Sequence, residues 1–405
     1  MQRRKVVITA VGMATPMGGS AQATFNALMA GKCGIGRHPV PGIEKCVGHV
    51  REDIALGMPA SQARMLDRVT LMALYAAEQA LVDAGLDARQ QAGCGVFVGT
   101  GIGGVTTLCE CVEAYHGLLS RPAVLVVPAS MPHAPAAYIA QRLCANTEAQ
   151  TYSTACSAGA VAIGEAFRRI RDGYLDVAIA GGTEAMLTPT LMAAWAQLHV
   201  LCADPDDPAA GYCRPFSSKR TGFALAEGAA MLVLESAEHA RARNATIIAE
   251  VCGYGVSNDG THPLRPDARG QALAMERCLH DGGLARDAIG YISAHGTGTL
   301  VGDRIETQAI KQVFGDRAYQ VPVSSIKGAV GHLIGAAGAV EAAVTAMAVQ
   351  HGRVPPTLFF QAGDPQCDLD YVPGQARALP GLRVALSNSF GMGGNNAVLA
   401  FGRVS

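Results

Sequence analysis

The sequence predicts an α/β protein built from two related halves. Of its 405 residues, 49% are hydrophobic, only 16% are charged and 48 are glycine, a composition typical of a well-buried globular protein. Runs of β-branched residues alternate with segments of helical periodicity along the chain. Two segments far apart in the sequence also repeat the same order of elements. We therefore expect a duplicated α/β architecture and not a chain of unrelated domains.

The composition excludes several classes of protein. A formal net charge of -1 provides no overall field for nucleic acid or for a membrane surface. No run reaches the roughly eighteen apolar residues of a membrane-spanning helix. The twelve cysteines have neither a disulfide framework nor zinc-ligand spacing, which predicts a reducing, cytoplasmic setting and no metal requirement. We expect no cofactor.

The first half alternates strands, helices and glycine-rich loops. A basic start followed by a short apolar run resembles a signal peptide, but the early glycine and proline favour a strand and loop. Residues 32–60 are irregular. The spacing predicts a strand over Val6–Val11, a helix over Gln22–Ala30 that Gly31 ends, a helix over Asp67–Asp83, a strand over Gly95–Gly99 and a helix from Cys156 to Arg171.

The second half repeats this order. Leu279–Leu284 echoes Leu81–Leu86, and each segment is followed by a loop, a strand and Gly-Thr-Gly. The segment after Tyr152 also aligns loosely with the segment after Val323. We predict an N-terminal half over 1–250 and a C-terminal half over 251–405. Residues of about 100–150 have no evident counterpart, which predicts an inserted lid or dimer-contact region.

One thiol stands out by its position. Cys156 follows a run of small residues and begins the predicted buried helix. The positive end of a helix dipole favours thiolate, and the free N–H groups there can bind an oxyanion. Buried cysteines are common, however, so this pattern alone fits a nucleophile or an ordinary core thiol.

Three further polar residues lie in glycine-rich loops of the second half. His295 follows a predicted strand, and Lys327 and His332 share a single loop. A cysteine can accept an acyl group as a thioester, and imidazoles can stabilise the enolate of a second substrate. Two histidines without an evident acidic partner favour carbon–carbon bond formation over hydrolysis.

Residues Gly99–Gly104 match a dinucleotide-binding pattern. The acid expected about twenty residues later is absent, so the pattern is not taken as a nucleotide site.

Four motifs together identify a family resemblance. TACSAG, AHGTGT, KGAVGHLIGAAG and NSFGMGGNN occur in order, and the likeness extends from Val6 to Phe401. The chain resembles the elongating, two-histidine β-ketoacyl-acyl carrier protein synthases of the thiolase superfamily. The resemblance implies the thiolase fold, with five layers (αβαβα) formed by two duplicated halves. It also implies decarboxylative Claisen condensation of a malonyl-carrier protein with a Cys-bound acyl chain, in fatty acid or polyketide-type biosynthesis.

The resemblance also implies partners and a role for each matching residue. The partners are acyl carrier protein, acyl and malonyl thioesters, and a second subunit in a homodimer or in a heterodimer with a related ketosynthase-like chain. The implied catalytic set is the nucleophile Cys156 with His295, His332 and Lys327, and the implied oxyanion hole is formed by the N–H groups of Cys156 and Met392. Asp303 and Glu341 are implied to support the site, and the acyl pocket and gate are implied to be Ile102, Phe223, Phe390 and Met392. A monovalent cation is implied near Glu341, Ser387 and Asn388.

The chain departs from the family pattern at two places. Met392 stands where elongating synthases usually carry phenylalanine. The region that docks the carrier protein is also less basic, with Arg64 and Arg68 there and Arg121 elsewhere. These departures favour a specialised pathway, such as polyene biosynthesis, or a specialised carrier protein.

Two alternative functions are weighed against this one. A non-catalytic chain-length-factor-like subunit typically lacks the nucleophile, which this chain retains. A thiolase-type CoA acyltransferase uses a second cysteine late in the chain, where this sequence has Phe390–Asn396 without one.

Overall fold

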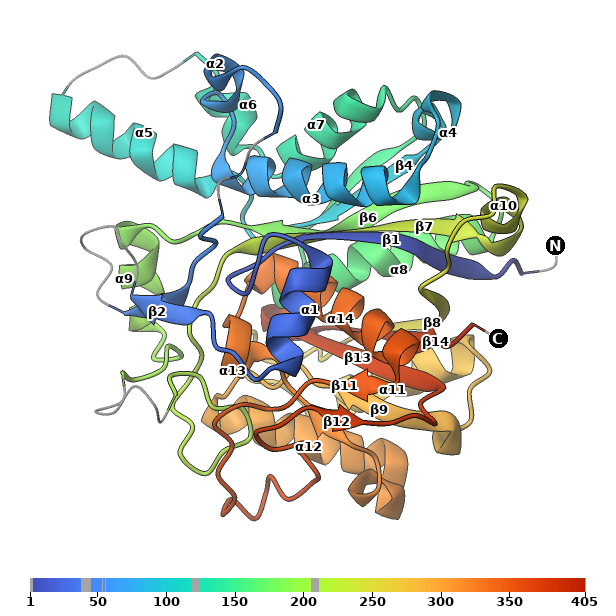
Figure 1. Cartoon of the computed structure of the whole chain (residues 1–405). Coiled ribbons are helices and arrows are strands. Elements are labelled where there is room, and N and C mark those ends of the chain that lie inside the picture. The colour runs from blue at the N-terminus through green and yellow to red at the C-terminus, as the bar shows by residue number, and fades with distance from the viewer. Residues whose placement is uncertain are drawn as a thin grey trace.

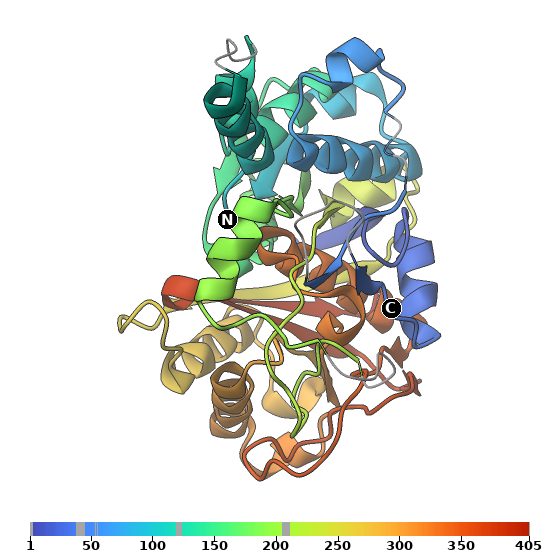
Figure 2. The same cartoon turned by 90° about the vertical axis from the view of Figure 1, so that its left-hand side faces the viewer.

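Helices and sheets lie in five stacked layers (Figures 1 and 2). The computed structural model describes residues 3–37, 45–52, 54, 56–118, 124–204 and 211–404. Helices α3 and α7 cover one outer face, and α11 and α12 cover the other (Figure 1). Helices α8 and α14 lie between the five strands of the first half and the five strands of the second half (Figure 1). The predicted α/β architecture of five layers and two duplicated halves is confirmed.

The strands form one long sheet and two small ones. The ten strands of the long sheet follow the order β10-β9-β13-β14-β8-β1-β7-β6-β4-β5. The strands are β1 (Val6–Ala14), β2 (Ile35–Arg37), β3 (Cys46–Gly48), β4 (Gly95–Gly99), β5 (Ala149–Tyr152), β6 (Val177–Glu184), β7 (Gly228–Ser236), β8 (Ala249–Asn258), β9 (Ile289–Ser293), β10 (Val323–Ser324), β11 (Arg353–Val354), β12 (Arg377–Ala378), β13 (Val384–Gly391) and β14 (Asn395–Gly402).

The helices follow the alternation that the sequence predicts. They are α1 (Ala21–Met29), α2 (Ala60–Ala63), α3 (Arg68–Ala84), α4 (Ala88–Ala92), α5 (Val105–Leu118), α6 (Val126–Ser130), α7 (Ala134–Leu143), α8 (Ala158–Arg171), α9 (Pro189–Gln197), α10 (Ala237–Ala242), α11 (Ala268–Asp281), α12 (Leu300–Phe314), α13 (Lys327–Val330) and α14 (Ala337–His351). Within the described residues none of them is long and apolar enough to cross a membrane.

The order of the sheet shows the duplication directly. The first half contributes β5-β4-β6-β7-β1 and the second half contributes β10-β9-β13-β14-β8, in mirrored order. The halves join where β1 and β8 pair antiparallel, between Val6–Ile8 and Ala249–Val251. The repeated segments also match in backbone conformation, because Gly85 and Gly283 both adopt positive φ, at 63° and 59°, after α3 and α11. Exact half boundaries stay a prediction.

The structure corrects two sequence-based expectations. Residues 100–150 are not wholly an insertion, because α7 in this segment corresponds to α12 of the second half. Helix α7 packs on α3 as α12 packs on α11. In the chain, α7 connects the parallel strands β4 and β5, and α12 connects the parallel strands β9 and β10. Within the described part of residues 100–150, α5 and α6 are the helices without a counterpart in the second half, and whether they form a lid or a dimer contact stays a prediction. The turn that matches Ala155–Ser157 is Ile334–Ala336, since these 3₁₀ turns lead into α8 and α14, whereas the sequence alignment had placed Lys327 opposite Cys156.

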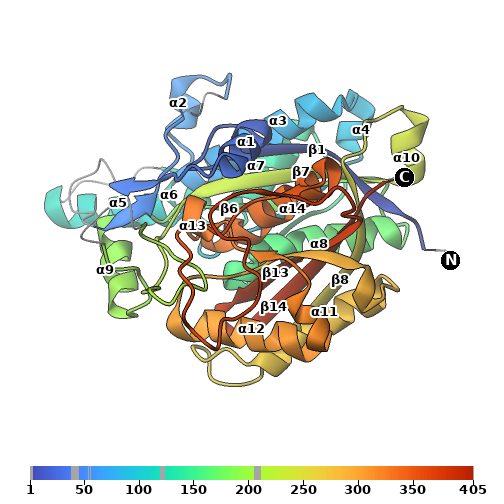
Figure 3. The same cartoon turned by 60° about the horizontal axis from the view of Figure 1, so that its bottom comes forward.

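Helices α8 and α14 meet at the centre of the molecule (Figure 3). Every residue of Ala337–Val349 is buried, so α14 has no solvent-facing side along this stretch. The close contact needs small residues: a Cβ on Gly159 would lie 2.8 Å from Ala339 N, and one on Gly338 would lie 2.9 Å from Ala160 N. This glycine contact sets the spacing of the two turns that begin the helices.

Substituting Gly164 tests how closely α8 packs on β8. A Cβ there would lie 2.3 Å from the ring of Tyr254 on β8. The overpacking cost of about 1–3 kcal/mol exceeds the roughly 1 kcal/mol that alanine adds in helix propensity. We expect Gly164→Ala to lower the free energy of unfolding by about 1–2 kcal/mol in urea titrations. Gly381→Ala, where a Cβ meets nothing within 4 Å, is the control and should leave it unchanged; equal effects of both would contradict this account.

Candidate active site

Cys156 lies in a strained turn between β5 and α8. The turn Ala155–Ser157 is a 3₁₀ helix, and Ala155 adopts a positive φ of 52°, which a non-glycine residue rarely does. This sharp bend places the thiol at the entrance to the central helix. Cys156 is only 4% exposed. The segment of small residues before and after Cys156 thus forms the sharp turn from β5 into α8.

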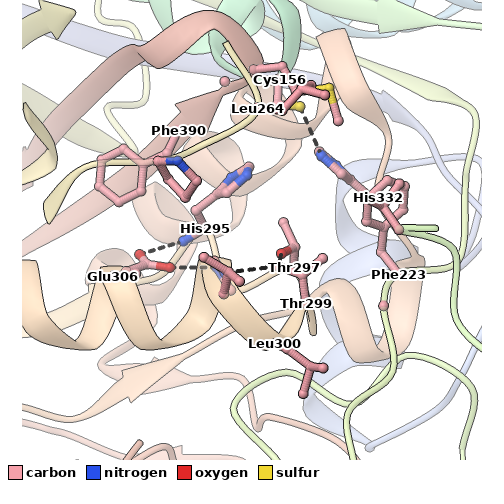
Figure 4. A pocket seen from close by; sticks show the side chains of 18 of the residues that line it. Cys156, Phe223, Leu264, His295, Thr297, Thr299, Leu300, Glu306, His332 and Phe390 are labelled. Carbon is pink, nitrogen blue, oxygen red and sulfur yellow. Dashed lines mark hydrogen bonds between the residues drawn. The ribbon is translucent and has the colours of Figure 1, made fainter. Parts of the chain in front are cut away.

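His332 contacts the thiol from the other half of the molecule. Its Nε2 lies 3.1 Å from Cys156 Sγ, and its Nδ1 accepts a hydrogen bond from the backbone N–H of Ile334 at 3.3 Å (Figure 4). Burial and the nearby Lys327 hold the pKa of His332 well below its usual value, so the ring is neutral. Because Nδ1 accepts a hydrogen bond, the single proton is on Nε2, which faces the thiol.

His295 lies beside His332 with the two rings edge to face, 5.3 Å apart. Lys327 donates from Nζ to the carbonyl of His295 at 2.6 Å and lies 3.4 Å from its Nδ1. The same amine forms a fully buried ion pair with Glu341. Burial lowers the pKa of His295 well below its usual range, and Lys327 lowers it further. His295 is therefore also neutral, with Nε2 available as a donor to the cavity.

The loop that carries His295 is held by two carboxylates on α12. Glu306 accepts the backbone N–H groups of His295 and Gly296 at 2.9 and 2.7 Å. Asp303 accepts those of Gly298 and Phe216 at 3.0 and 2.6 Å. The family resemblance implies a supporting role for Asp303 but not for Glu306. Helical spacing could have pointed to Glu306, because residues three apart share one face of a helix.

The buried thiol is not a thiolate at rest. Burial raises the pKa of Cys156 to about 11, although Lys327 and the backbone N–H of Met392 both act to lower it. Desolvation in the free site therefore opposes the thiolate that a helix dipole favours, and the effect of the dipole itself stays a prediction.

Two cavities meet at Cys156 and Met392. The first, of about 420 Å³, is open to the surface and is lined by His295, His332, Phe223 and Phe390 as well as Thr297 and Thr299. The second, of about 330 Å³, is lined by Ile102, Met186, Trp195 and Ile334. The four residues assigned to acyl pocket and gate therefore lie on both sides of the thiol. Phe223 packs edge to face on His332 at 4.9 Å, which fixes the wall of the first cavity.

A metal ion is a poor fit for this cluster. The ligand atoms of Cys156, His295 and His332 lie within 4.8 Å of one another, and a thiol with two imidazoles is a donor set that zinc accepts. The amine of Lys327, 3.4 Å from His295, would repel a cation there. We therefore interpret the cluster as a set of hydrogen-bond donors around a nucleophile.

The docking arginines have different surroundings. Arg64 is exposed after α2. Arg68 instead forms a two-pronged ion pair with the buried Glu227 at 2.7 and 2.6 Å and donates to the carbonyl of Val50, so it braces the fold. Arg121 lies outside the described residues.

Comparison with known proteins gives the family. A model described as "Beta-ketoacyl synthase, N-terminal domain" matches residues 3–240, and its C-terminal counterpart matches residues 248–361. The chain belongs to the β-ketoacyl synthase family. Like its relatives, it is an acyltransferase that forms 3-oxoacyl products by condensation.

Full-length relatives and solved structures agree with this membership. The chain is 40% identical to a 3-oxoacyl-[acyl-carrier-protein] synthase 2 of Synechocystis, over 99% of this chain and 98% of the relative. It is also 40% identical to a nodulation protein E of a Rhizobium species, over 99% and 100%. A β-ketoacyl synthase from Burkholderia phymatum superposes with a TM-score of 0.90 at 35% identity, covering 99% and 100% of the chains. A type II polyketide ketosynthase in complex with its acyl-carrier protein superposes at 0.91 with 31% identity, covering 100% of both.

The raised pKa of Cys156 has a measurable consequence. Because the folded thiol titrates near pH 11, its thiolate fraction should rise about tenfold per pH unit between pH 7 and 10. We expect the rate of iodoacetamide labelling at Cys156, followed by peptide mass spectrometry, to rise in proportion without a plateau. Lys327→Met should slow labelling at pH 9, because Lys327 lowers the thiol pKa. The surface variant Lys311→Met should not; a plateau at neutral pH would contradict the assignment.

Proposed function

We propose that Cys156 carries the acyl group as a thioester and that His295 and His332 promote decarboxylation of a malonyl thioester beside it. The observation that supports this most directly is the 3.1 Å contact between Cys156 Sγ and His332 Nε2, made across the two halves inside a buried cavity. A neutral imidazole donor is suited to an oxygen that gains negative charge as the reaction proceeds.

Acyl transfer is the first step. Cys156 Sγ attacks the thioester carbonyl and loses its proton, the new C–S bond forms, and the carrier's C–S bond breaks. The departing thiolate takes up one proton, so the step is balanced. The backbone N–H groups of Cys156 and Met392 stabilise the oxyanion. The N–H of Met392 hydrogen-bonds to the Cys156 thiol in the free site. The acyl chain then occupies the second cavity, beside Ile102 and Trp195.

Condensation is the second step. A malonyl thioester enters the first cavity, where Nε2–H groups of His295 and His332 donate to its carbonyl oxygen. Loss of carbon dioxide leaves the enolate, whose carbon attacks the acyl carbonyl. A C–C bond forms, the C–S bond to Cys156 breaks, and the released thiolate takes up one proton from water to restore the thiol. Lys327 adds positive potential and fixes the proton of His295 on Nε2. Asp303 and Glu306 keep the His295 loop in place.

Substrates are proposed to arrive on an acyl carrier protein, as the names of the relatives state for those proteins. Thr297 and Thr299 line the first cavity along the path from its mouth to Cys156. Among the described arginines predicted for carrier docking, Arg64 is the remaining candidate, because Arg68 is engaged with Glu227. The proposed pathway is fatty acid or polyketide-type synthesis. The proposed setting is a reducing compartment such as the cytoplasm, because all twelve cysteines are free thiols.

A second subunit is proposed to cover α5. This helix projects from the body (Figure 1) and exposes Leu108, Val112 and Tyr115 on one face. The subunit is a second copy or a related ketosynthase-like chain, as the ishigamide ketosynthase pairs with a chain length factor.

A monovalent cation near Glu341, Ser387 and Asn388 is also proposed. Glu341 Oε2, Ser387 Oγ and Asn388 Oδ1 are buried oxygens that find no hydrogen-bond partner within the described part of the chain. Oxygen donors of this kind suit a hard cation. A bound cation would supply positive charge near Glu341, and these three residues would hold it.

Acylation of Cys156 is the direct test. Incubation with acyl-carrier protein should add one acyl mass to Cys156, and malonyl-carrier protein should then release a 3-oxoacyl product, both followed by mass spectrometry. Cys156→Ala should lower condensation by about 10³-fold or more, because no other group forms the thioester. Cys278→Ala, an equally buried thiol on α11, should remain active.

Two outcomes would reject the proposal. An unmodified Cys156 with several acyl donors would exclude the nucleophile. Acylation followed by hydrolysis, with no new carbon–carbon bond, would exclude condensation.

A further inference from the structure

A buried carboxylate that the proposed steps do not use joins both halves behind the thiol. Glu184 ends β6 and is 0% exposed. Its Oε2 accepts the backbone N–H of Gly101 at 2.6 Å and that of Gly335 at 3.0 Å. Thr100 donates to Oε1 at 3.4 Å. The carboxylate therefore collects donors from the loop after β4 and from the turn that precedes α14.

The glycines at these positions make the bridge possible. A Cβ on Gly101 would lie 2.5 Å from Glu184 Oε2, and one on Gly335 would lie 2.7 Å from the same atom. Only residues without a side chain allow two backbone N–H groups to approach one oxygen here. Such a nest of N–H groups stabilises an anion that is otherwise strongly desolvated.

The turn that Glu184 holds also sets the proton of His332. Ile334, adjacent to Gly335, has a strained positive φ of 44°, and its N–H donates to His332 Nδ1 at 3.3 Å. The hydrogen bond from Gly335 to Glu184 fixes this unfavourable conformation. Without it, the N–H of Ile334 is free to turn away, and Nε2 of His332 loses its fixed position 3.1 Å from Cys156 Sγ.

The same carboxylate reaches the acyl side of the site. Ile102, next to Gly101, and Ile334, next to Gly335, both line the second cavity. One side chain thus fixes the wall of this cavity and the orientation of a histidine in the first.

We propose that Glu184 is a positioning residue for the condensation reaction, which orients His332 through the Ile334–Gly335 turn and holds that turn against the Gly101–Ile102 loop. This inference rests on the proposed function, since it assigns Glu184 to the histidine that promotes decarboxylation.

The test compares two buried glutamates of neighbouring strands. Glu184→Gln keeps the size but removes the negative charge, so the amide oxygen that takes the place of Oε2 is a weaker acceptor for the two glycine N–H groups than the carboxylate. Glu235→Gln is the matched control: Glu235 on β7 is also 0% exposed, and its partners are Thr9, His239 and Arg243, none of which lines either cavity. Malonyl-carrier protein decarboxylation, Cys156 acylation and the thermal midpoint are measured for both.

We expect Glu184→Gln to lower kcat for decarboxylation by about 10²-fold while KM for malonyl-carrier protein stays within about twofold, because misplacement of about 1 Å has that effect. Glu235→Gln should keep kcat within about twofold of the wild type even where its thermal midpoint falls. Glu184→Asp, which keeps a carboxylate but withdraws it, should lower kcat about tenfold and serves if the glutamine variant does not fold.

The inference is overturned if Glu184→Gln or Glu184→Asp decarboxylates as fast as the wild type, or if Glu235→Gln loses as much kcat as Glu184→Gln. Failure of the proposed function looks different, because the wild-type protein itself would then show neither Cys156 acylation nor condensation.

Discussion

The contact between α8 and α14 is the constraint on which the site depends. Each helix begins with a 3₁₀ turn whose first residue has positive φ, Ala155 in one half and Ile334 in the other. The turns can lie side by side only because residues at the crossing lack large side chains. A Cβ on Gly182, for example, would lie 2.6 Å from the carbonyl of Gly335. Duplication thus supplies two turns, and glycine brings them close enough for a thiol of one half to meet a histidine of the other.

Burial decides the charge state of the reacting groups. The thiol is protonated, because its pKa rises to about 11, and both imidazoles are neutral, because their pKa values fall. A neutral site of this kind holds oriented N–H donors that need no reorganisation as an oxyanion or enolate develops. Coulomb attraction from a charged imidazolium is not required. Neutral donors also avoid the large cost of burying uncompensated charge.

Carboxylates around the site share one structural role. Asp303, Glu306 and Glu184 each accept two backbone N–H groups from loops that carry functional residues. Burial raises the pKa of Asp303 and Glu184 to about 7, while these hydrogen bonds act in the opposite direction. Irregular loops lack their own backbone partners, so a buried carboxylate is an efficient way to satisfy and fix them. The shape of the active site is therefore maintained by buried carboxylates that fix its loops.

The sequence predicts those features that depend on neighbours in the chain. The strand Gly95–Gly99 and the helix after Asp67 follow from local periodicity and capping, and both have the expected positions. Cys156, His295 and His332 are recognisable because their motifs are contiguous. Glu184 and Gly335 are 151 residues apart, and Arg68 and Glu227 are 159 apart, so their pairing requires the fold. The desolvation of the Cys156 thiol cannot be predicted from the sequence for the same reason. The start of a helix depends on neighbouring residues, whereas burial depends on the whole fold.

Met392 shows how one residue can meet two opposing demands. Its backbone N–H must stay fixed near Cys156 to stabilise an oxyanion, yet the residue also lines both cavities, between which an acyl chain has to pass. The backbone is anchored, because the N–H of the next residue, Gly393, donates to the carbonyl of Pro263 at 2.8 Å. A methionine side chain has three rotatable bonds and a polarizable sulfur, so it can reshape the passage while its own N–H stays in place. A rigid aromatic ring at this position would couple the two demands, since clearing the passage would require the loop itself to shift. We therefore expect the methionine that distinguishes this chain from the usual family pattern to separate acyl selection from oxyanion stabilisation.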